Sequence, residues 1–119
     1  MIDTDPQAHT TQLLGLQPKA SLYDLLVRNE RLKNVVDMAP KQFYDPEKTS
    51  KGHVVVIRGN DETGLIPMKM NDPLLLRDRI EKVADIIDFV LIDTSPTPSL
   101  LSAVINIAAD GVLYPTKCE

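Results

Sequence analysis

Short apolar runs separated by amphipathic segments constrain the fold of this sequence more than any other feature. Residues 53–57 and 89–92 are largely β-branched or aliphatic with no polar alternation, and residues 111–115 follow the same pattern. Strands that are apolar on both sides are typical of parallel sheets covered by helices. The sequence therefore predicts an α/β fold, with a mostly parallel sheet and helices on both faces.

The segments between these runs carry helix signals. Ser21 and Asp24 have the spacing of an N-terminal capping arrangement, Gly15 can close a helix, and Pro73 suits a first helical turn. Apolar residues recur at helical spacing in most of these segments. The predicted helical segments are residues 8–14, 22–28, 30–38, 73–87 and 99–109.

Composition narrows the class of protein. The 119 residues are 43% hydrophobic, which is enough for a single domain with a core, and no apolar run approaches the roughly 18 residues of a membrane span. A single cysteine, Cys118, fits the reducing cytoplasm, and two isolated histidines give no metal-ligand spacing. The sequence predicts a cytoplasmic protein without a membrane partner.

Acidic residues stand where two of the predicted strands end. Asp3 and Asp5 follow the apolar start of the chain, and Asp93 follows residues 89–92. Ligands of parallel α/β sheets bind at the carboxyl ends of strands, and a strand-end Asp is well placed to hold hydrated Mg²⁺. Alternatively, Asp93 only caps a turn before Pro96. The sequence pattern alone leaves these two interpretations open.

Several motifs taken together are more specific. The stretches that carry the resemblance are residues 2–8 (Ile-Asp-Thr-Asp-Pro-Gln-Ala), 14–16 (Leu-Gly-Leu), 21–26 (Ser-Leu-Tyr-Asp-Leu-Leu), 89–96 (Phe-Val-Leu-Ile-Asp-Thr-Ser-Pro), 99–106, 108–112 and 115–119. They occur in an order that resembles the ParA-type partition ATPases. This is the ParA/MinD group, whose phosphate-binding motif is a deviant Walker sequence. Residues 89–96 resemble its Walker B strand, whereas residues 41–56 match the family poorly.

The resemblance implies a P-loop NTPase-like fold and an ATPase that uses ATP and Mg²⁺. It also implies dimerisation on ATP, DNA binding without sequence preference, and stimulation by a ParB-type partner to segregate plasmids or chromosomes. By motif, Asp5 would orient or deprotonate the attacking water. Asp93 would lie at the Mg²⁺ site, and Asp3 would support the water shell of the metal. Thr94 and Pro96 would belong to the nucleotide-binding residues.

The sequence departs from the family at one motif. No G-x-x-x-x-G-K-[ST] phosphate loop occurs in it. We therefore expect residues 1–119 to be a single partial ATPase domain, a fragment that lacks the Walker A loop and binds no ATP or Mg²⁺ by itself. A sheet without the strand that bears this loop is incomplete and has an unpaired edge, so we also expect homo-oligomers.

Two other functions remain open, and with them whether the chain is an enzyme. One is a non-catalytic interaction module that pairs with an intact ATPase, because such a module would share every motif. The other is a phospho-acceptor signalling domain, a class that requires an acidic pair after one strand, an Asp after a later strand and a Lys near the end. Asp3 with Asp5, Asp93 and Lys117 could take these positions. The long separation between Asp5 and Asp93 disfavours this second alternative.

Overall fold

A computed structural model describes residues 1–17 and 19–118 of the chain. Its centre is a four-stranded sheet in the order β2-β3-β1-β4, in which β3, β1 and β4 are parallel and β2 is antiparallel to β3. The strands are β1 (Ile2–Asp3), β2 (Val36–Met38), β3 (Val55–Ile57) and β4 (Ile92–Asp93). The predicted α/β class and mostly parallel sheet are confirmed.

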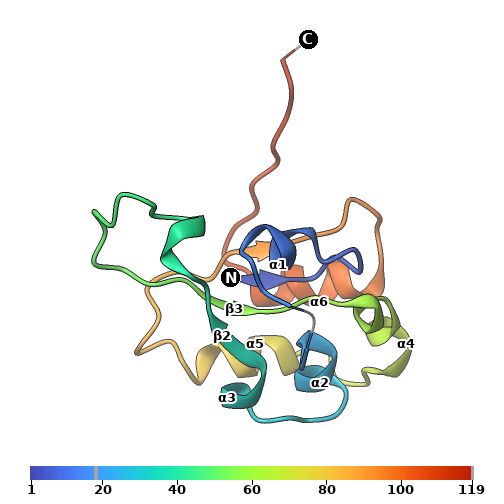
Figure 1. The fold of residues 1–119 in the computed structure, drawn as a ribbon. Coiled ribbons are helices and arrows are strands. Elements are labelled where there is room, and N and C mark those ends of the chain that lie inside the picture. The colour runs from blue at the N-terminus through green and yellow to red at the C-terminus, as the bar shows by residue number, and fades with distance from the viewer. Residues whose placement is uncertain (18, 119) are drawn as a thin grey trace.

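Helices supply the main core on one face of the sheet (Figure 1). The helical elements are α1 (His9–Leu13), α2 (Leu22–Leu26), α3 (Leu32–Val35), η1 (Lys41–Phe43), η2 (Asp61–Leu65), α4 (Ile66–Lys69), α5 (Leu75–Glu81) and α6 (Leu100–Ala108). Strand residues Ile2 and Ile57 pack with apolar side chains of α2, α4, α5 and α6, among which Leu22, Leu25 and Leu76 are fully buried. The burial of these side chains holds the helices on the sheet.

Helix α1 packs against β1. Thr11 of α1 hydrogen-bonds to Asp3 of β1. Gly15 ends α1 in a left-handed conformation, with φ of 69°, as predicted. A Cβ atom at this position would clash with the ring of Phe43. The backbone angle favours glycine here, and any other residue would also have to displace the ring of Phe43.

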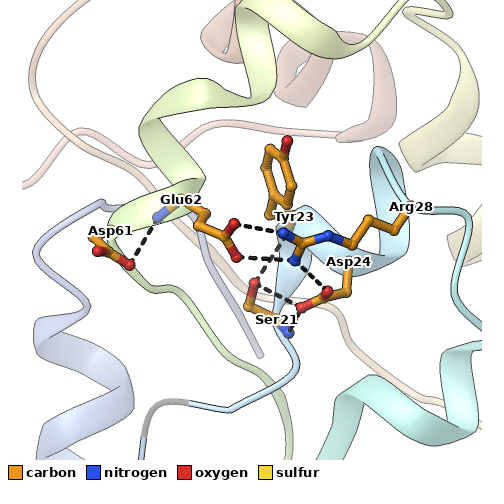
Figure 2. A network of polar contacts seen from close by, with 6 residues as sticks. All are labelled: Ser21, Tyr23, Asp24, Arg28, Asp61 and Glu62. Carbon is orange, nitrogen blue, oxygen red and sulfur yellow. Dashed lines mark hydrogen bonds and ion pairs between the residues drawn. The ribbon is translucent and has the colours of Figure 1, made fainter.

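The predicted cap of α2 is present and belongs to a larger polar network (Figure 2). The Ser21 hydroxyl accepts from the Tyr23 N–H, and the Asp24 carboxylate accepts from the Ser21 N–H at 2.7 Å. Arg28 bonds both Asp24 and Glu62, and its guanidinium lies 4.7 Å from the centre of the Tyr23 ring. This network ties α2 to η2 and so fixes the chain that leaves β3.

Several predicted elements are shorter in the structure or missing from it. Residues 111–115 form no strand; they are extended, exposed and lead away from the body toward the C-terminus (Figure 1). The strand predicted at 89–93 is reduced to β4, and the predicted helix over 30–38 is only α3, followed directly by β2. A strand exists only where a neighbour pairs with it, and sequence periodicity does not report the neighbour.

Within the described residues, no helix combines the length and apolar character needed to cross a membrane.

Candidate functional site

The two strand-end aspartates face each other across one pair of strands. Asp3 of β1 is the register partner of Asp93 of β4, and β1 and β4 are parallel. The Ile2 N–H donates to the Leu91 carbonyl at 2.8 Å, and the Thr4 N–H donates to the Asp93 carbonyl at 3.0 Å. These bonds place both carboxylates at the carboxyl end of the sheet, where ligands of this architecture bind.

Asp3 is buried and bonds to neighbouring backbone and side-chain groups. Its side chain is completely buried, and one carboxylate oxygen accepts from the Thr11 hydroxyl at 2.6 Å and from the Thr11 N–H at 2.8 Å. The other oxygen accepts from the Asp5 N–H at 3.1 Å. Hydrogen bonds from neutral donors satisfy the buried charge, as a buried carboxylate requires. In this structure Asp3 therefore positions α1 and the backbone of Asp5.

Asp93 has a different environment. Its side chain is exposed, and one oxygen accepts from the Thr10 hydroxyl at 2.6 Å. The Thr4 hydroxyl donates to the Asp93 carbonyl at 2.6 Å, which fixes the backbone at the end of the strand. An exposed carboxylate on a fixed backbone can reach a solvated ion, whereas Asp3 cannot without breaking its bonds.

Asp5 lies just beyond β1 and is half-buried. One of its carboxylate oxygens accepts from the Gln7 N–H at 3.0 Å, an Asx-type turn that orients the side chain. Gly59 packs against this turn so closely that a Cβ atom there would lie 2.9 Å from the Asp5 carbonyl and 3.1 Å from the Asp3 carboxyl carbon. The end of β3 thus helps to fix the position of Asp5.

The remaining predicted residues line a cleft. Asp93, Thr94 and Pro96 line a depression of about 960 Å³, together with residues 87–92. Thr10 also lines this depression, and Asp5 is not among the lining residues. The structure therefore brings Asp93, Thr94 and Pro96 to one cleft, whereas Asp5, two residues beyond the end of β1, does not line it.

The donor set suits a hard divalent cation. Carboxylate and hydroxyl oxygens from Asp93, Thr94 and Thr10 are the type of ligand that Mg²⁺ takes, usually together with several waters. In the described part of the chain, no three acidic, histidine or cysteine side chains form a metal-binding group by themselves. A metal here would accordingly depend on water or on ligand oxygens for most of its coordination.

Directly after β3, the charged side chain of Arg58 has a structural role. Arg58 is buried and forms an ion pair with Asp37 of β2, and burial lowers the pKa of Arg58. Its backbone carbonyl accepts from the Leu22 N–H at 2.9 Å. Arg58 therefore joins α2 and β2 to the end of β3.

Sequence reasoning did not single out Thr10 and Thr11. Consecutive threonines on one short helix bond the two strand-end aspartates, Thr10 to Asp93 and Thr11 to Asp3. Their position in the sequence could have indicated this role. The two threonines lie one helical turn beyond the Asp-x-Asp-Pro turn, on a helix that must pack back onto the sheet.

Comparison with known proteins places these residues in a family. A family model described as an AAA domain matches residues 1–119. A probable plasmid-partitioning protein ParA from Thermus thermophilus is 32% identical over 98% of this chain. The sporulation initiation inhibitor protein Soj from Bacillus subtilis is 25% identical over the whole chain. The chain covers 34% and 46% of these two relatives, so it spans less than half of their length.

A solved structure has the same fold. Apo McdA from Cyanthece superposes with a TM-score of 0.69 and 21% identity, over 90% of this chain and 42% of that protein.

Proposed function

Because the chain belongs to the ParA-type family of partition ATPases, we propose that it supplies the acidic half of an ATP-hydrolysing site. The observation that carries the proposal is the register pairing of Asp3 with Asp93 at the carboxyl end of β1 and β4, with Asp5 two residues beyond β1. Phosphoryl transfer depends mainly on the positioning of the reactants and on charge neutralisation, and both need fixed carboxylates.

In this proposal the residues divide the work. Asp93 and the Thr94 hydroxyl would hold Mg²⁺ through its bound waters. Asp5 orients or deprotonates the water that attacks the terminal phosphate. Asp3 has a supporting role, because its bonds to Thr11 and to the Asp5 N–H fix the turn on which Asp5 stands.

The nucleotide needs donors that this sequence does not provide as a phosphate loop. Backbone N–H groups and a lysine normally surround the phosphates, and unshielded carboxylates would repel them. ATP and Mg²⁺ are therefore cofactors of a complete site, in which another segment supplies the phosphate donors. Pro96, which lines the cleft, would lie near the bound nucleotide.

The biological role in this proposal is the segregation of plasmids or chromosomes in the cytoplasm. A ParB-type partner would stimulate hydrolysis, and the assembled dimer would bind DNA without sequence preference. The chain itself carries a formal net charge of −4, so a DNA-binding surface would have to be a local patch of basic residues.

An exchange experiment tests the proposal. The part of the Thermus thermophilus relative that matches this chain is replaced by residues 1–119, and ATP binding and hydrolysis of the chimera are measured. We expect the chimera to hydrolyse ATP, and Asp5→Asn to slow hydrolysis by about 10²–10⁴-fold with little change in ATP affinity. Asp85→Asn, an exposed change outside the cleft, is the matched control.

A second candidate is favoured by one observation: among the described residues, β4 pairs only with β1. A non-catalytic module could use the other edge of this strand to pair with an intact ATPase. The same chimera separates the two functions: a folded chimera that binds ATP but hydrolyses none, whatever residue stands at position 5, would support the module and contradict the acidic half-site.

A further inference from the structure

The hydroxyl of Thr10 in α1 bonds directly to the aspartate that the proposed function assigns to the metal site. It donates to one carboxylate oxygen of Asp93 at 2.6 Å, although the two residues are 83 positions apart in the chain. Both residues line the same cleft. A hydrogen bond from a hydroxyl to an ionised carboxylate is short and roughly twice as strong as one between neutral groups. The bond therefore restricts the direction in which the Asp93 carboxylate points.

The backbones at both ends of this bond are held in place. The carbonyl of Asp93 accepts from the Thr4 N–H at 3.0 Å and from the Thr4 hydroxyl at 2.6 Å. On the other side, Thr10 is followed by Thr11, whose hydroxyl and N–H both donate to the buried carboxylate of Asp3. The freedom that remains to Asp93 is rotation of its own side chain, and the bond from Thr10 limits that rotation.

The bond divides the two carboxylate oxygens of Asp93 between two partners. Thr10 bonds Oδ2 and leaves Oδ1 to a ligand in the cleft. In proteins Mg²⁺ usually keeps several of its waters, and one carboxylate oxygen is enough to accept from such a water. Donors that orient a carboxylate at a metal site in this way matter for binding, since their loss typically lowers metal affinity by about 10–100-fold.

Helix α1 also connects the two halves of the proposed site. Asp5 does not line the cleft that contains Asp93. The Asp5 N–H donates to one oxygen of Asp3 at 3.1 Å, and the Thr11 hydroxyl donates to the other at 2.6 Å. Because Thr10 and Thr11 are neighbours on one short helix, that helix sets Asp93 relative to the turn that carries Asp5. A change at Thr10 affects the Asp93 end of this connection and leaves the Asp3 end intact.

We propose that Thr10 is a positioning residue of the metal site, which holds the Asp93 carboxylate with its second oxygen available to a metal-bound water. The inference rests on the proposed function, because that function assigns Asp93 to Mg²⁺. Thr10 acts through Asp93 and takes no part in the chemical step. The two neighbouring threonines thus have different roles: Thr11 stabilises the fold, and Thr10 adjusts the affinity for the cation.

Metal binding to the chimera with the Thermus thermophilus relative tests this role. Mn²⁺ takes the same oxygen ligands as Mg²⁺, and its binding with a non-hydrolysable ATP analogue is measured by electron paramagnetic resonance. We expect Thr10→Val to weaken Mn²⁺ binding about tenfold. Thr10→Ser keeps the hydroxyl and should restore binding close to that of the wild type. Thr97→Val is the matched control, because Thr97 is exposed and does not line the cleft.

A double-mutant cycle with Asp93→Ala distinguishes positioning from direct ligation of the cation by Thr10. If Thr10 acts through Asp93, Thr10→Val should cause no further loss of Mn²⁺ affinity once the Asp93 carboxylate is absent. Losses that add would show direct ligation and overturn the proposal. A folded Thr10→Val chimera that binds Mn²⁺ as tightly as the wild type, or a Thr10→Ser chimera as weak as Thr10→Val, would also overturn it. Circular dichroism checks that each variant is folded.

The same measurements keep this inference apart from the proposed function. A wild-type chimera that binds the analogue with Mn²⁺ but hydrolyses no ATP would contradict the acidic half-site. The Mn²⁺ affinities of the variants would then still decide the role of Thr10. A wild-type chimera that binds no Mn²⁺ together with the analogue would overturn both.

Discussion

The bonds that Thr11 makes to Asp3 and Gly59 allow a quantitative test of the site's architecture. The Thr11 hydroxyl donates to the buried Asp3 carboxylate at 2.6 Å and accepts from the Gly59 N–H at 3.0 Å. Thr11→Val keeps the shape of the side chain and removes both bonds. The change therefore isolates the polar contribution of one buried hydroxyl.

The expected loss follows from these two bonds. A hydrogen bond to a charged group contributes about 1.5–3 kcal/mol, and an unpaired buried N–H costs about 1–3 kcal/mol. The two contributions overlap in part, so we expect Thr11→Val to lower the free energy of unfolding by about 3–4 kcal/mol. Domains of this size are stable by only about 5–15 kcal/mol, so the loss is a large share of the total.

Urea denaturation followed by far-ultraviolet circular dichroism measures the effect. With a slope of about 2 kcal/mol per molar urea, the midpoint should fall by roughly 1.5–2 M. Thr10→Val is the matched control, because its bond to Asp93 is exposed, and it should cost less than about 1 kcal/mol. Thr11→Ser keeps the hydroxyl and should cost about 1 kcal/mol for the lost methyl group.

The result that would refute this reasoning is equal destabilisation by Thr10→Val and Thr11→Val, or a loss below about 1 kcal/mol for Thr11→Val. Either result would mean that the bond between Thr11 and the buried Asp3 carboxylate does not stabilise the strand ends. A slope that changes between variants would indicate a change in the unfolded or native ensemble instead, and the midpoints could not then be compared.

Other contacts lead to three more predictions. Calorimetry of the chain with ATP and Mg²⁺ should give no micromolar binding; a value near about −8 kcal/mol would show that other groups in this chain supply the phosphate donors. Gly59→Ala should destabilise the chain by about 1–3 kcal/mol in urea denaturation, since its Cβ would lie 2.9 Å from the Asp5 carbonyl; an unchanged midpoint would contradict the close packing of that turn. Hydrogen bonds from the Ser50 and Thr49 N–H groups lower the pKa of Asp45 in the folded chain. The ionised carboxylate therefore stabilises the fold at pH values above about 3.9, the ordinary pKa of Asp. This stabilisation is lost as the pH falls from about 3.9 through the lowered pKa of the folded chain. Thermal melts between about pH 5 and 2 should therefore show a smaller decrease for Asp45→Asn than for the wild type, and parallel curves would rule this out.

Local sequence chemistry determined much of this protein. The capping of α2 by Ser21 and Asp24, the end of α1 at Gly15 and the start of α6 after Ser99 all depend on groups within a few residues, and their positions could be predicted. The α/β class followed from the apolar runs. The position of aspartates at strand ends could also be predicted, because Asp3 and Asp93 directly follow apolar runs in the sequence.

Only the tertiary structure decided how these elements meet. The pairing of Asp3 with Asp93 joins residues 90 positions apart, and no local pattern fixes such a register. The same holds for the difference between the two carboxylates, buried and braced at Asp3 but exposed at Asp93, which depends on where α1 crosses the sheet. Residues 111–115 give the reverse case. Their sequence has strand character, but a strand forms only when a neighbouring strand satisfies its backbone, and no described strand pairs with them.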